Sequence, residues 1–137
     1  MEAHDSPELD LVKEQLAAFL SRYRDHVSFA YLFGSMAKGE AHPKSDLDLA
    51  VYLSHGSDEE MFQVRLALHG DLCRAFHRND IDLVVLNTAS NLMLLDEILR
   101  YGIVVFDLDS AQREGFELDR LHQSLDFRQQ RKAIMGV

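Results

Sequence analysis

The sequence predicts a single α/β domain in which helices pack on a β-sheet. Short runs of β-branched, aromatic and aliphatic residues alternate along the chain with longer segments whose apolar residues recur at helical spacing. That alternation is typical of α/β domains. The chain has 137 residues, of which 47% are hydrophobic and 27% are charged, and this length and composition suit one globular domain.

Four helices are expected from apolar periodicity and end signals. Ser6 before Pro7 is typical of a helix start, with serine as the N-cap and proline at the first helical position. Ser57 and Glu60 have the spacing of a capping box, and Gly102 marks a helix end. The expected helices span residues 7–25, 57–76, 90–102 and 110–133.

Four short apolar segments between these helices are expected to be strands. The first, VSFAYLF, ends at Gly34, and the second, DLDLAVYL, begins with two aspartates. The third begins with Asp80, and the fourth directly follows Gly102. The expected strands span residues 27–33, 46–53, 80–86 and 103–107.

The net charge of the chain argues against one class of binding partner, the nucleic acids. Fourteen basic and 23 acidic residues give a net charge of −9, which a nucleic-acid backbone would repel, so no direct nucleic-acid binding is expected. An acidic chain instead suits a cationic partner, a metal or simple solubility. No apolar run approaches the roughly 20 residues that span a bilayer, so no membrane contact is expected. A polar, acidic start and a single cysteine, Cys73, favour a cytoplasmic location.

Two aspartates share one face of the second expected strand. Residues i and i+2 of a strand point the same way, so Asp46 and Asp48 should project together while Leu47 and Leu49 face apolar packing. Neighbouring carboxylates repel one another unless a cation lies between them, and Mg²⁺ prefers such oxygen ligands. An isolated Asp-x-Asp is also compatible with two solvated side chains on an edge strand.

Two further elements accompany this pair. Gly34 and Ser35 end the preceding strand, where glycine permits close approach of a phosphate and the backbone N–H groups and serine hydroxyl can bind it. The third strand supplies another carboxylate. Asp82 lies deeper in the apolar run than Asp80, which we keep as the substitute, and a buried acid requires a partner. A phosphate-binding turn beside metal-binding carboxylates indicates nucleotide phosphate chemistry.

This constellation resembles the nucleotidyltransferase superfamily related to DNA polymerase β. The resemblance rests on Gly34-Ser35, ten intervening residues, Asp46-x-Asp48, and Asp82 within an apolar strand. It implies a nucleotidyltransferase fold with a mixed sheet as one domain over residues 1–137. The core would cover about 8–107, and the helix of about 110–133 matches only loosely.

Within this superfamily the chain resembles the minimal nucleotidyltransferase (MNT) antitoxins of HEPN/MNT pairs, because few residues follow the core. That resemblance implies a hetero-oligomer with a HEPN toxin, an all-helical ribonuclease. The MNT protein would transfer AMP from ATP to a toxin tyrosine and so silence the toxin. Two other functions stay open: an antitoxin that masks its toxin by contact alone, and nucleotide transfer to a small molecule such as an antibiotic.

The resemblance also assigns roles to residues. Gly34 and Ser35 would hold the triphosphate, and Asp46 and Asp48 would bind two Mg²⁺ ions. Asp82 would complete the metal site and help deprotonate the acceptor hydroxyl. Lys38 and Lys44 lie in the intervening loop, where each would either reach the phosphates or remain solvated.

Overall fold

A computed structural model describes residues 7–39 and 46–135, with side chains to residue 123. All four expected helices and all four expected strands are present, in the expected order. The first helix is shorter than expected because its α-helical part ends at Leu20 and a 3₁₀ turn, η1, follows. The elements are α1 (Pro7–Leu20), η1 (Ser21–Tyr23), β1 (Val27–Phe33), β2 (Leu47–Leu53), α2 (Asp58–Phe76), β3 (Ile81–Val85), α3 (Leu92–Tyr101), β4 (Ile103–Asp107) and α4 (Ser110–Met135).

The strands form one mixed sheet with the order β3-β2-β1-β4. β1 is antiparallel to both of its neighbours, β2 and β4. β2 is parallel to β3, and α2 is the crossover that this parallel pairing requires. The mixed α/β sheet expected from the sequence is therefore confirmed.

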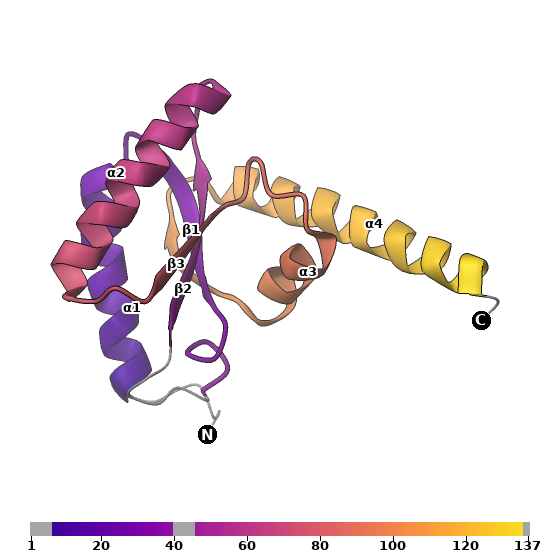
Figure 1. Cartoon of the computed structure of the whole chain (residues 1–137), viewed down its shortest axis with the longest axis horizontal. Coiled ribbons are helices and arrows are strands. Elements are labelled where there is room, and N and C mark those ends of the chain that lie inside the picture. The colour runs from indigo at the N-terminus through magenta and orange to yellow at the C-terminus, as the bar shows by residue number, and fades with distance from the viewer. Residues whose placement is uncertain (1–6, 40–45, 136–137) are drawn as a thin grey trace.

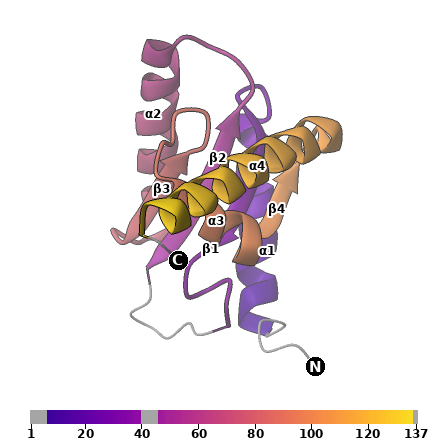
Figure 2. The same cartoon turned by 90° about the vertical axis from the view of Figure 1, so that its right-hand side faces the viewer.

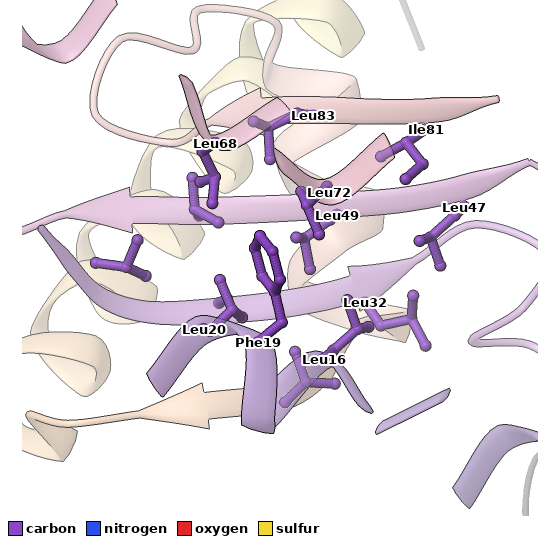
Figure 3. Close-up of a cluster of buried hydrophobic side chains, with 14 of the residues drawn as sticks. Leu16, Phe19, Leu20, Leu32, Leu47, Leu49, Leu68, Leu72, Ile81 and Leu83 are labelled. Carbon is purple, nitrogen blue, oxygen red and sulfur yellow. The ribbon is translucent and has the colours of Figure 1, made fainter. Parts of the chain in front are cut away.

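The helices cover both faces of the sheet. α1 and α2 lie on one face, and α3 and the first part of α4 lie on the other (Figures 1 and 2). The odd-numbered side chains of β2 and β3 point toward α1 and α2, as the alternation predicted. The resulting core contains Leu16, Phe19, Leu20, Leu32, Leu47, Leu49, Leu68, Leu72, Ile81 and Leu83, all labelled in Figure 3.

A second apolar cluster lies under α3 and α4. The rings of Phe29 and Tyr52 stack at 4.7 Å between centroids, and Phe116 of α4 packs against both. Leu95 and Ile98 of α3 are buried in the same cluster. Beyond this contact α4 continues away from the sheet (Figure 1). The even-numbered residues of β2 and β3 therefore face α3 rather than α1 and α2.

Polar contacts fix the start of α4 on the sheet. The Tyr31 hydroxyl donates to Glu117 at 2.7 Å, and Arg113 donates to Asp107 of β4 at 2.8 Å and to Glu117 at 3.1 Å. Burial, and then the Glu117 carboxylate, raise the pKa of Tyr31 well above its ordinary value, so this hydroxyl keeps its proton at physiological pH.

Two end signals read from the sequence are observed. Ser57 caps α2, and Ser57 and Glu60 form the reciprocal hydrogen bonds of a capping box. Gly102 follows α3 in extended conformation, where a Cβ would lie 2.3 Å from the carbonyl oxygen of Ile98. The glycine is therefore required by close backbone approach. No helix within the described residues is long and apolar enough to cross a membrane.

The core assignment predicts a sharp difference between two leucines. Leu49 is 0% exposed at the centre of the sheet, whereas Leu11 on α1 is 54% exposed. We expect Leu49→Ala to lower the free energy of unfolding by about 2–5 kcal/mol, because it leaves a cavity. Leu11→Ala should change it by less than about 0.5 kcal/mol. Urea denaturation measures both, and equal losses would contradict the assignment.

Candidate active site

The aspartates gather on the sheet face that α3 covers. Asp48 of β2 lies in register with Asp82 of the parallel strand β3, and on its other side it pairs with Phe33 of β1. Asp46 directly precedes β2 and is exposed, while Asp48 is half-buried. The expected neighbourhood of the Asp-x-Asp pair and a carboxylate of the third strand is therefore observed.

Asp82 and Asp80 differ in their surroundings in a way that the sequence did not indicate. Asp82 was expected to be the more enclosed, yet it is exposed, because β3 is an edge strand of the sheet. Asp80 is half-buried and accepts two hydrogen bonds from Arg78, at 2.7 and 2.8 Å. These bonds hold the pKa of Asp80 below its ordinary value. Asp82 is thus the carboxylate that is aligned with Asp48, and Asp80 is paired with a cation.

Gly34 lies in direct contact with the Asp48 carboxylate. A Cβ built at Gly34 would lie 2.0 Å from Asp48 Oδ2, closer than any real contact. The backbone φ of Gly34 is also +77°, in the left-handed region that side chains disfavour. Two independent constraints therefore require glycine here. The sequence suggested that glycine admits a phosphate, and the observed neighbour is a carboxylate.

Residues 34–39 form a turn beside the aspartates. The Lys38 N–H donates to the Gly34 carbonyl and the Gly39 N–H to the Met36 carbonyl, each at 3.3 Å. Ser35 is half-buried within this turn, next to Gly34. Lys38 Nζ lies 2.9 Å from Glu97 of α3. Lys44, the other lysine expected near the phosphates, lies outside the described residues.

The electrostatics of Asp48 show crowding of negative charge. Burial, and after it the carboxylates of Asp82, Asp46 and Glu97 in that order of importance, together raise its pKa to about 6. A divalent cation would relieve this repulsion, and an all-oxygen donor set suits Mg²⁺. Within the described residues, no three His, Cys, Asp or Glu side chains converge closely enough to hold an ion. The aspartates fit a metal by position and chemistry, and their side chains would have to turn toward it.

Glu97 is the site residue that the sequence reasoning missed. It lies on α3, far along the chain from both Asp46 and Asp48, and only the packing of α3 on the sheet brings it near them. Its acidic character and helical position resemble those of any surface glutamate. Nothing in the sequence pattern distinguishes it.

Cys73, the single cysteine, lies on the opposite face of the sheet from the aspartates. It is half-buried in α2, and its Sγ lies 3.9 Å from Nε2 of His69. The same nitrogen is 2.9 Å from the carbonyl oxygen of Ile81, a contact in which it acts as the hydrogen-bond donor. Nε2 then has no lone pair to accept the thiol proton, which fits a packing role for Cys73.

Residues 14–111, well over half of the chain, match the family model described as Polymerase beta, Nucleotidyltransferase. The chain belongs to this nucleotidyltransferase family. The match contains the Gly34–Ser35 turn, both strands that carry the aspartates, and α3. The nucleotidyltransferase fold expected from the sequence is therefore confirmed, and with it the enzyme class. No curated protein matches the chain with significance.

Solved structures extend the likeness of this nucleotidyltransferase along most of the chain. One, a toxin–antitoxin with AMP-PNP, is 26% identical with a TM-score of 0.73, covering 90% of this chain and 95% of that one. A second, a tri-AMPylated Shewanella oneidensis HEPN toxin in complex with MNT antitoxin, is 23% identical with a TM-score of 0.69, covering 93% and 96%. A third, the MntA-HepT toxin–antitoxin, is 24% identical with a TM-score of 0.67, covering 93% and 96%. The resemblance to MNT antitoxins is thus confirmed.

The contact between Gly34 and Asp48 predicts opposite effects for two glycine substitutions. Gly34→Ala should lower the free energy of unfolding by about 1–3 kcal/mol, because it combines positive φ with a clash against Asp48. Gly115→Ala should raise it by about 0.5–1 kcal/mol, because Gly115 is helical and its Cβ would meet nothing within 4 Å. Urea denaturation distinguishes the signs. A loss of similar size in both variants would contradict the close contact between Gly34 and Asp48.

The raised pKa of Asp48 predicts a pH-dependent stability. The folded chain holds this proton more tightly than the unfolded chain, so stability should fall as the pH rises from about 4 through about 6 in metal-free buffer. Asp48→Asn removes this loss. After allowance for solvent screening, the variant should exceed the wild type by about 1 kcal/mol at a pH of about 7.5, and by nothing at about 4. Urea denaturation with a chelator tests this, and a difference independent of pH would contradict it.

Proposed function

We propose that this nucleotidyltransferase is an antitoxin that transfers AMP from ATP to a tyrosine hydroxyl of a HEPN ribonuclease toxin and so silences it. The observation that carries the proposal is the register of Asp48 with Asp82, beside the turn that begins at Gly34. Carboxylates from adjacent strands lie there beside the turn of residues 34–39, which contains Ser35. That arrangement suits a nucleotide triphosphate with its divalent cations.

The chemistry is a displacement at phosphorus. The tyrosine oxygen attacks the α-phosphorus of ATP, a bond forms between them, and the bond from that phosphorus to the bridging oxygen breaks. Pyrophosphate leaves with the electron pair, and the hydroxyl proton passes to a carboxylate, for which we assign Asp82. Such a reaction demands mainly positioning and charge neutralisation, so a small set of residues can suffice.

Each residue has a defined part in this scheme. Asp46 and Asp48 would hold two Mg²⁺ ions, with Asp82 completing the site on the acceptor side. The ions would supply the positive charge that stabilises the attacking and leaving oxygens. Gly34 and Ser35 would bind the triphosphate, and Lys38 and Lys44 would contribute further positive charge.

The assignment of a protein acceptor has separate support. The solved structures named above include a HEPN toxin that is AMPylated and bound to an MNT antitoxin, and a toxin–antitoxin bound to AMP-PNP. A further structure of such a complex carries two aspartate-to-glutamate substitutions two positions apart, the spacing of Asp46 and Asp48. A net charge of −9 also suits a basic partner rather than a nucleic acid. We place the reaction in the cytoplasm.

The intact mass of the cognate HEPN toxin tests the proposal. After incubation with this chain, ATP and Mg²⁺, the toxin mass should increase by one or more AMP units. Asp46→Asn and Asp48→Asn should each abolish the gain, because the metal ligands are lost. Asp25→Asn, which changes an exposed aspartate far from the site, should leave it intact.

Two outcomes would overturn the proposed chemistry. If the toxin mass stays unchanged while the two proteins form a stable complex, the antitoxin masks its toxin by contact. If an aminoglycoside gains the AMP mass and the toxin does not, the acceptor is a small molecule.

A further inference from the structure

Lys38 contacts two residues of α3. Its ammonium lies 2.9 Å from Glu97 Oε1 and 5.0 Å from the centroid of the Tyr101 ring. Glu97 and Tyr101 are four positions apart and therefore adjacent on one face of the helix. A carboxylate and an aromatic ring face both attract a cation. We call Glu97 and Tyr101 the α3 holder.

The ion pair between Lys38 and Glu97 lies beside the candidate site. Lys38 belongs to the turn of residues 34–39, and α3, which carries Glu97, covers the sheet face from which the aspartates project (Figure 1). A nucleotide at this turn would therefore meet Lys38 already paired with a carboxylate.

The contacts of Lys38 with Glu97 and Tyr101 are weak enough for the lysine to leave them for another partner. The side chains of Lys38 and Glu97 are 33% and 40% exposed, and water screens ion pairs of that exposure. The lysine side chain is flexible, and its ammonium is a compact charge that can turn to a new partner. A triphosphate bound at the Gly34 turn would offer several negative oxygens to a lysine four positions away.

We propose that Glu97, assisted by Tyr101, is a positioning residue that retains Lys38 on α3 and competes for it with the triphosphate of the bound nucleotide. Glu97 thereby limits nucleotide affinity, and Lys38 moves from the α3 holder to the phosphates when ATP binds. This inference rests on the proposed function, since it requires a triphosphate at the turn.

Calorimetric binding of AMP-PNP with Mg²⁺ tests the exchange. Glu97→Gln keeps the shape of the side chain and removes its charge, so it should lower the Kd about fivefold. Lys38→Ala should raise the Kd. In the Lys38→Ala background, Glu97→Gln should change the Kd by less than about twofold, because the group that it releases is gone.

Asp96→Asn is the matched control. Asp96 neighbours Glu97 on α3 and is also paired with a cation, Arg100, at 3.0 Å. Removing its charge should leave the Kd unchanged, whereas a general effect of negative charge on α3 would tighten binding in this variant too.

Three results would overturn the inference. If Glu97→Gln raises the Kd, Glu97 orients Lys38 toward the phosphates instead of withholding it. A Kd that Glu97→Gln leaves unchanged would show that the ion pair does not compete with nucleotide. If the wild-type chain binds no nucleotide, the proposed function fails and this inference fails with it.

Discussion

The parallel pairing of β2 with β3 is the constraint on which the candidate site depends. It places Asp48 beside Asp82, and it is maintained by the leucines that the same two strands bury under α1 and α2. Because side chains alternate, a slip of one residue would bury Asp82 and expose Leu83. The apolar core on one face therefore enforces the arrangement of carboxylates on the other. Stability and site geometry are two results of one register.

This register brings carboxylates together at a partly buried position, where burial and mutual repulsion both disfavour negative charge. Asp48 is half-buried beside other carboxylates, and Gly34 approaches it so closely that no other residue fits. A folded chain accepts such repulsion when a ligand relieves it, and a cation with a nucleotide is the matching ligand. Three other carboxylates close to the sheet are each paired with an arginine. Asp80 is paired with Arg78, and Asp107 and Glu117 are paired with Arg113.

The sequence predicted the elements well because each carries a local signal. Alternation marks the strands, the capping box of Ser57 marks the start of α2, and Gly102 marks the end of α3. The same alternation predicted that Asp46 and Asp48 share a face. Local signals do not include strand order, so the edge position of β3 and the exposure of Asp82 were not predictable. The pairing of Lys38 with Glu97 depends on how α3 packs on the sheet, and no spacing in the sequence encodes it.

The separation of the two faces gives Cys73 a practical value. It is the only thiol in the chain, and it lies half-buried in α2, across the sheet from the aspartates. A thiol-reactive dye would therefore attach at one defined point without touching the nucleotide side. Because the thiol is partly covered by packing, its labelling rate should follow the local opening of α2. Cys73 can therefore report local opening of α2 without interfering with nucleotide binding on the other face of the sheet.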